Sequence, residues 1–141
     1  MTAASGNTRT RKSRAVDDTY LLELHLGRPK TITVGRLGRH RFSSGYYIYV
    51  GSARRNFYHR IRRHLRKKKK MHWHIDYLLK HAAITRVYSC NLAEEATAAK
   101  LARSMKVPIP HFGSSDKRSI SHLFSGVLNV QVPGMVLHRV F

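Results

Sequence analysis

The stretch that decides the fold is GYYIYVGSA, residues 45–53. Aromatic and β-branched residues dominate it, and such residues favour a pleated strand that is at least half buried. Because successive side chains of a strand point to opposite faces, Tyr47 and Tyr49 share one face of this strand. Gly51 ends the run and lets another group approach the backbone closely. The stretch therefore predicts a core strand with two tyrosines on one face.

Three further strands are predicted around this segment. Residues 20–26, YLLELHL, alternate with period two, which places Tyr20 on the same face as three leucines. Residues 31–34 are mostly β-branched and predict a shorter strand, and residues 84–90 predict another. The basic residues 35–40 are expected to form a loop.

Three helices are predicted from apolar stripes and capping residues. Asn56 is expected to cap the first, whose apolar residues recur at i, i+4 and i+8. The second covers residues 75–82. The third follows a capping box, with Asn91 as the cap and Glu94 at the third helical position, and runs to about Met105.

These elements predict a small α+β fold, in which a short antiparallel sheet is covered by helices. Residues 1–16 are small, polar and basic, and they predict a disordered arm. Residues 17–141 are expected to form a single domain. Its C-terminal extension, from about residue 126, alternates loosely and predicts a last strand.

The composition excludes several classes of protein. The chain has 141 residues, which suits one domain, and its single cysteine, Cys90, excludes a disulfide framework. No apolar run is long enough to span a membrane, and the N-terminus lacks the apolar core of a signal peptide. We therefore expect a cytoplasmic protein, associated with the nucleoid if the source is prokaryotic.

The charge is large and of one sign. Lys and Arg number 27 against 7 Asp and Glu, so the formal net charge is +20, and no acidic residue lies between Glu23 and Asp76. Phosphate contacts explain such a stretch better than a solvated surface does, so DNA or RNA is the expected partner. No membrane partner is expected, because no stretch pairs these cations with a large apolar face. The expected nucleic-acid-binding residues are Arg54, Arg55, Arg62, Arg63, Arg66, Lys67, Lys68, Lys69 and Lys70.

A group of residues that suits phosphodiester chemistry begins at the end of the tyrosine-rich strand. Tyr49 ends that strand, Gly51 leaves room for a phosphate, and Arg60 and His64 lie one helical turn apart on the next helix. In such a group an arginine neutralises a phosphoryl oxygen, while a tyrosine or histidine moves a proton. Two plainer alternatives stay open: the tyrosines belong to the core, or the basic helix only binds.

A second group is formed by His72, His74 and Asp76. In a strand these three would share one face, at a spacing that metal ligands use. The plainer alternative is that Asp76 caps a helix or orients a histidine while Trp73 packs in the core. A role in a site that faces nucleic acid, with Trp73 stacked on a base, also stays open.

Five segments together, GYYIYVGSA, RIRRHL, WHIDYLL, FGSSD and SHLF, resemble the GIY-YIG-related domain associated with endonuclease III. That domain occurs alone or fused to the DNA-repair glycosylase. The resemblance covers roughly residues 18–124. It implies a three-stranded antiparallel sheet flanked by helices, and a DNA-repair glycosylase such as endonuclease III as a partner.

The resemblance also implies a catalytic site. GIY-YIG nucleases cut DNA with two tyrosines, an arginine, often a histidine, and a glutamate that binds one divalent metal ion. In this chain Tyr20 and Tyr49 match the two tyrosines. Arg60 matches the helix arginine, and His64 matches the histidine one turn later. Glu95 fits the spacing of the glutamate, so the implied cofactor is Mg²⁺ or Mn²⁺ held by Glu95.

Two assignments near the end of the domain have alternatives. Glu94 fits the spacing of the metal-binding glutamate less well, and both glutamates could instead compensate the helix dipole in the first turn. Ser121 and His122 lack the nucleophile elbow of a serine hydrolase, and their segment is interpreted as a turn that lines a phosphate site.

The expected function is that of a nucleic-acid-binding domain that hydrolyses phosphodiester bonds as a metal-dependent DNA endonuclease in repair. In the expected mechanism Tyr49 or Tyr20 helps to deprotonate a water, and Arg60 stabilises the phosphate charge. The neighbouring arginines would have to lower the phenol pKa from its ordinary value near 10. The alternative is an adaptor that binds DNA or RNA without chemistry. A third class, a packing protein, would use charge alone.

Overall fold

The computed structural model describes residues 18–53, 56–114 and 118–139. The predicted arm over residues 1–16 and two predicted nucleic-acid-binding residues, Arg54 and Arg55, lie outside the described residues. Within the described part of the chain, no helix is long and apolar enough to cross a membrane.

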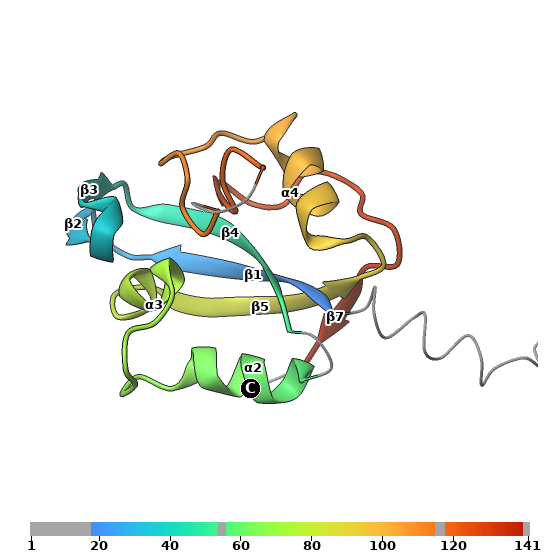
Figure 1. Cartoon of the computed structure of the whole chain (residues 1–141), viewed down its shortest axis with the longest axis horizontal. Coiled ribbons are helices and arrows are strands. Elements are labelled where there is room, and N and C mark those ends of the chain that lie inside the picture. Colours follow the sequence, from blue (N-terminus) through green and yellow to red (C-terminus); the bar gives the residue numbers. More distant parts are fainter. Residues whose placement is uncertain (1–17, 54–55, 115–117, 140–141) are drawn as a thin grey trace, which may run out of the picture.

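The central sheet is antiparallel throughout and has five strands, rather than the three expected. Its order is β6-β4-β1-β5-β7, so β1 lies at the centre and the C-terminal strands form both edges (Figure 1). The strands are β1 (Thr19–Leu26), β4 (Gly45–Ser52), β5 (Ala83–Cys90), β6 (Leu123–Ser125) and β7 (Val136–His138). The single last strand expected after residue 126 is therefore β7, and β6 precedes that segment.

A separate two-stranded sheet projects from one end of the main sheet. It pairs β2 (Lys30–Thr33) with β3 (Arg39–Phe42), and a short 3-10 helix, η1 (Gly35–Leu37), joins them. The expectation of a loop over residues 35–40 is wrong, because Gly38 adopts a positive φ of 92° and reverses the chain into β3. Phe42 then returns to the core and is almost fully buried.

Helices cover both faces of the main sheet. The helices α2 (Phe57–Leu65) and α3 (His74–Leu79) lie on one side, and α4 (Glu94–Ala102) lies on the other (Figure 1). Two core clusters result, the first around Tyr20 and Ile61 and the second around Leu21 and Leu101. The expected α+β class is confirmed. Because helices cover both sides of the sheet, the side chains on both faces of β1 are buried, with His25 as the exposed exception.

One of the two predicted helix caps is confirmed in position. Asn56 is the N-cap residue of α2, although its side chain makes no capping hydrogen bond. The helix α4 begins at Glu94 after Ala93, so the predicted capping box at Asn91 is wrong. The backbone N–H of Asn91 instead donates to the carbonyl of Pro133 at 2.7 Å. This bond ties the end of β5 to the chain before β7, a long-range contact that local sequence does not indicate.

Candidate functional site

The closest packing in the candidate site is between Gly51 and Tyr20. The two residues are directly paired in the register of β4 and β1. A Cβ atom at Gly51 would lie 2.5 Å from the Tyr20 hydroxyl oxygen, which is far inside van der Waals contact. The absence of a side chain at Gly51 therefore leaves room for the Tyr20 phenol to lie across the strand end.

The Tyr20 hydroxyl is paired with His64 of α2. Its oxygen and the His64 Nε2 atom share a hydrogen bond of 2.7 Å. Burial is the main cause that lowers the pKa of His64 to about 3, so the imidazole is neutral near pH 7. Among the described residues, the His64 Nδ1 atom has no hydrogen-bond partner. The pair is thus a neutral phenol and a neutral imidazole enclosed between β1 and α2.

Tyr49 lies beside this pair on the same face of the sheet. Its ring centroid is 6.3 Å from that of His64 and 6.3 Å from that of Phe112. Gly113 closes over it, since a Cβ atom there would lie 3.2 Å from Tyr49 Cε1. The exposed fraction of Tyr49 is 7%, and that of Tyr20 is 1%.

The protonation of the two phenols corrects one expectation. Burial raises the pKa of Tyr20 and of Tyr49 above the ordinary value, and the charge of Glu94 raises both further. The guanidinium of Arg60 opposes this shift at both phenols but does not outweigh burial. The expected lowering of the phenol pKa by neighbouring arginines is therefore wrong, because the loss of hydration destabilises a buried phenolate more than the charge of Arg60 stabilises it.

Arg60 is held at the edge of the cluster. Its Nη1 atom donates to the carbonyl of Ser52 at 3.1 Å, directly after Gly51. Its guanidinium also lies over the Trp73 ring, 4.5 Å from the centroid, and that of Arg63 lies over the same ring at 4.4 Å. Trp73 therefore orients two arginines through cation–π contacts, a role that its sequence position did not indicate.

The predicted group of His72, His74 and Asp76 does not form a metal-ligand set. The Asp76 carboxylate accepts two hydrogen bonds from Arg63 and the backbone N–H groups of His72 and Trp73. The His74 Nδ1 atom instead accepts the N–H of Gly113 at 2.8 Å. Asp76 thus caps α3, as the plainer interpretation proposed, and also draws Arg63 away from solvent.

The two glutamates of α4 flank a histidine. His122 Nε2 lies 2.7 Å from Glu95 Oε2, and His122 Nδ1 lies 3.2 Å from Glu94 Oε2. Burial alone would lower the pKa of His122, but its two carboxylate neighbours raise it. The carbonyl of His122 accepts the N–H of Val50 at 2.9 Å. His122 therefore links α4 to β4 between two carboxylates, whose charges favour the protonated form of its ring.

The fit of Glu95 to a divalent metal ion is poor in this arrangement. Its oxygens already accept hydrogen bonds from the Ser119 N–H, the Ser119 hydroxyl and His122. These bonds lower its pKa against the opposing effect of burial. In the described residues, no three His, Cys, Asp or Glu side chains are placed to hold a metal ion together.

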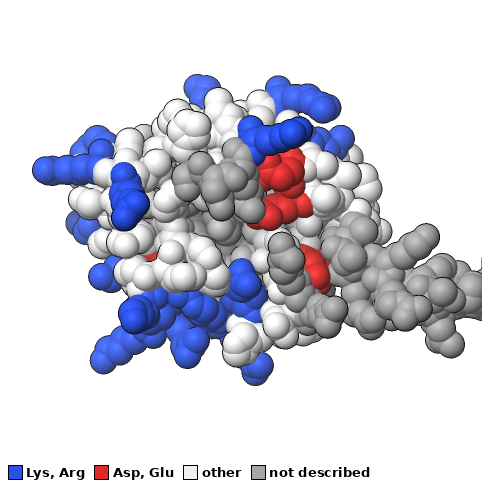
Figure 2. Space-filling view, in the orientation of Figure 1, with Lys and Arg blue, Asp and Glu red and all other residues white. Residues whose placement is uncertain are grey.

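The predicted binding residues differ in how firmly hydrogen bonds hold them and in their exposure; the exposed Lys67, for example, still donates to the carbonyl of Leu79 at 3.4 Å. Lys69 donates to the carbonyls of Arg63 and His64 at the end of α2, and burial is the main cause that lowers its pKa to about 8. Arg63 is held by Asp76. Five cations of the set are solvent-exposed: Arg62, Arg66, Lys67, Lys68 and Lys70. On the face drawn in Figure 2, one large group of blue side chains lies at the lower left, whereas the red ones lie right of centre with further blue side chains above them.

The comparisons with known proteins identify a family but no characterised relative. Residues 19–136 match the family model described as Domain of unknown function DUF123, and the chain belongs to this family. No curated protein and no solved structure matches the chain.

Proposed function

We propose that this protein binds nucleic acid through the surface formed by α2 and residues 66–70. The observation that carries the proposal is the one-sided charge of this surface, which has no acidic residue between Asn56 and Lys70. Phosphates are the abundant anions that match such a surface, and their contacts release condensed counterions. The groove along α2, about 510 Å³ in volume and lined by arginines and His59, offers a path for a phosphate backbone.

We further propose that the DUF123 domain is a GIY-YIG-like domain. The support is the convergence of four matched residues at one end of β1, β4 and α2. Tyr20 is hydrogen-bonded to His64, and the ring of Tyr49 packs against the same histidine. Arg60 donates a hydrogen bond to the backbone carbonyl that follows Gly51. These residues come from segments up to 44 positions apart, so local sequence alone does not bring them together.

Cleavage of DNA is the second candidate function, and the same convergence favours it over a packing protein. In this proposal Arg60 stabilises the phosphate charge, and the protonated phenols donate hydrogen bonds rather than act as bases. To hold Mg²⁺ or Mn²⁺ in this proposal, Glu95 would have to give up its bonds to Ser119 and His122. The other carboxylate is that of Glu94, whose charge acts on both phenols. The burial of Tyr20 and Tyr49 favours the alternative, an adaptor, with a DNA-repair glycosylase such as endonuclease III as the proposed partner.

The test is cleavage of nicked and branched DNA in Mn²⁺, with binding measured on the same substrates. An endonuclease is expected to cut, and Tyr49→Phe, Glu94→Ala and Glu95→Ala are expected to reduce cutting while binding persists. Arg103→Gln, an exposed cation after α4, is the control that leaves both unchanged. Binding without cutting by the wild type would support the adaptor. Absence of binding would contradict the proposed function.

A further inference from the structure

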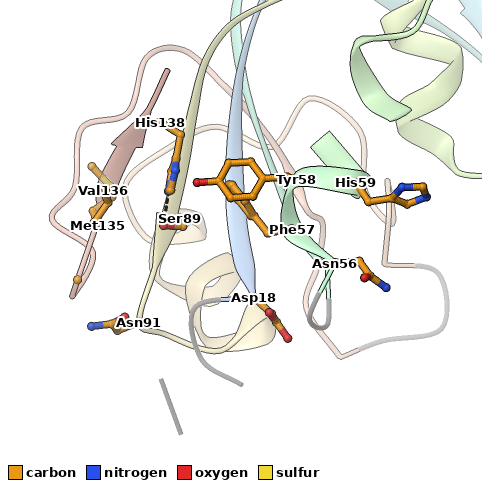
Figure 3. A pocket seen from close by; sticks show the side chains of 11 residues that line it. Asp18, Asn56, Phe57, Tyr58, His59, Ser89, Asn91, Met135, Val136 and His138 are labelled. Atoms are coloured by element: carbon orange, nitrogen blue, oxygen red, sulfur yellow. Dashed lines mark hydrogen bonds between the residues drawn. The ribbon is translucent and has the colours of Figure 1, made fainter. Parts of the chain in front are cut away.

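A second cleft lies beside the basic surface, at the start of α2. It has a volume of about 800 Å³, which is within the range of small-molecule sites. One wall is α2 and the other is β7 with the end of β5 (Figure 3). Its lining side chains are Asp18, Asn56, Phe57, Tyr58, His59, Ser89, Asn91, Met135, Val136 and His138.

The cleft presents aromatic rings, one of which is largely exposed. Tyr58 has an exposed fraction of 62%. Its ring points from α2 towards His138 in Figure 3, with centroids 6.1 Å apart. The ring centroid of Phe57 lies 4.9 Å from that of Tyr58 and 4.6 Å from that of His138. The arrangement leaves one face of the tyrosine open to a flat ligand.

Polar groups of the cleft are fixed by the sheet. The Ser89 hydroxyl and His138 Nε2 share a hydrogen bond of 2.7 Å across β5 and β7. Burial lowers the pKa of His138, so its ring is uncharged at neutral pH. These groups suit an uncharged, hydrogen-bonding ring better than an anion.

The cleft and the basic groove adjoin each other. His59 lines both, and the remaining groove residues are Arg62, Arg63, Leu65 and Arg66. A strand whose phosphates lie along this groove reaches the cleft at His59. Nucleic-acid bases that are not paired stack readily on exposed aromatic rings, whereas paired bases cannot.

We propose that this cleft takes an unpaired base of a nucleic acid whose backbone lies on α2, with the base stacked on Tyr58. The inference rests on the proposed nucleic-acid binding and gives its substrate class: a duplex with a single-stranded extension, rather than a blunt one.

The test compares the affinity of the full chain for a blunt duplex and for the same duplex with a single-stranded overhang. The wild type is expected to prefer the overhang. Tyr58→Ala is expected to weaken overhang binding by about five- to a hundredfold and to leave blunt-duplex binding unchanged. Tyr58→Trp is expected to keep the preference. Tyr46→Ala, which removes another exposed tyrosine remote in sequence, is the matched control.

A titration with adenosine monophosphate, followed by amide NMR shifts, separates the cleft from the basic surface. Shifts at Ser89, Val136 and His138 are expected. The cleft proposal would be overturned if Tyr58→Ala lost affinity equally for both duplexes or lost none for either. It would also be overturned if the nucleotide produced no amide shifts. If neither duplex binds, the proposed function fails, and the nucleotide titration alone then decides whether the cleft takes a base.

Discussion

Gly51 is the residue on which the arrangement of the candidate site depends most directly. Any side chain there would collide with the Tyr20 phenol, which has no free space because it is buried between β1 and α2. The hydrogen bond from Tyr20 to His64, and the contact of Tyr49 with His64, depend on that position. A substitution at a residue without a side chain should therefore disturb three side chains at once.

Gly51→Ala is expected to lower the free energy of unfolding by about 1–3 kcal/mol, because the added methyl group overpacks the core at the Tyr20 ring. Urea unfolding measures the change. Gly27→Ala is the matched control, since a Cβ atom there meets nothing within 4 Å, and it should leave stability within about 0.5 kcal/mol. Equal effects of the two substitutions would contradict the packing argument.

His64 makes the fold sensitive to acid. Its pKa is about 3 in the folded protein against 6.5 ordinarily, so the unfolded chain binds a proton between these values and the folded chain does not. Stability from neutral His64 is therefore present above pH 6.5 and lost as the pH falls towards 3, by at most about 1.4 kcal/mol per pH unit.

Unfolding measured from pH 7 to pH 4 checks this dependence. The stability difference between the wild type and His64→Gln should shrink as the pH falls, because the variant has no imidazole to protonate. His59→Gln, at an exposed histidine of the same helix, should run parallel to the wild type. Parallel curves for His64→Gln would show that His64 does not remain neutral in the fold.

Among the elements, α2 and α3 are joined by one buried carboxylate. Asp76 is fully buried, and it accepts hydrogen bonds from Arg63 of α2 and from the backbone N–H groups of the two residues that precede α3. Arg63 in turn lies over Trp73, beside Arg60. The position of the site arginine Arg60 therefore depends on how α3 is attached to α2.

Asp76→Ala is expected to destabilise the protein by about 3–5 kcal/mol, because it leaves the partly buried Arg63 without its carboxylate and two backbone donors without an acceptor. Thermal or urea unfolding measures it. Arg86→Ala removes an exposed partner of Glu23, at 3.7 Å, and is expected to cost less than about 1 kcal/mol. A small loss for Asp76→Ala would mean that the two helices are held by apolar packing alone.

At the scale of the whole molecule, the densest group of exposed cations lies on one side of the sheet. Arg62, Arg66, Lys67, Lys68 and Lys70 are exposed in and after α2, whereas Glu94 and Glu95 lie on α4 at the other side of the sheet. A polyanion should therefore approach the α2 side, and its binding should depend strongly on salt.

Replacing Arg62 and Arg66 by glutamine is expected to weaken binding to duplex DNA. Because each substitution removes about one phosphate contact, the slope of log K against log salt should fall in magnitude by about two. Fluorescence anisotropy over a range of salt concentrations measures the slope. Arg103→Gln should leave the slope unchanged. A slope that stays the same in the double variant would place the phosphates elsewhere.

Much of the fold could be predicted because its elements have local signals. The alternation from Tyr20 to Leu26 and the helical stripe of Phe57, Ile61 and Leu65 required no knowledge of distant residues. The strand β3 and the start of α4 could not be predicted in this way. They depend on the positive φ of Gly38 and on the contact of Asn91 with Pro133, which local pattern does not indicate.

The candidate site divides in the same manner. The amino-acid sequence by itself determined the strands and helices that carry Tyr20, Tyr49, Arg60 and His64, and the excess of positive charge, because periodicity and charge are properties of residue order. Only the tertiary structure decided the burial of the phenols, their raised pKa, and the enclosure of His122 by two carboxylates. Desolvation and hydrogen bonding depend on which distant groups surround an atom, and the packing of both sheet faces sets those surroundings.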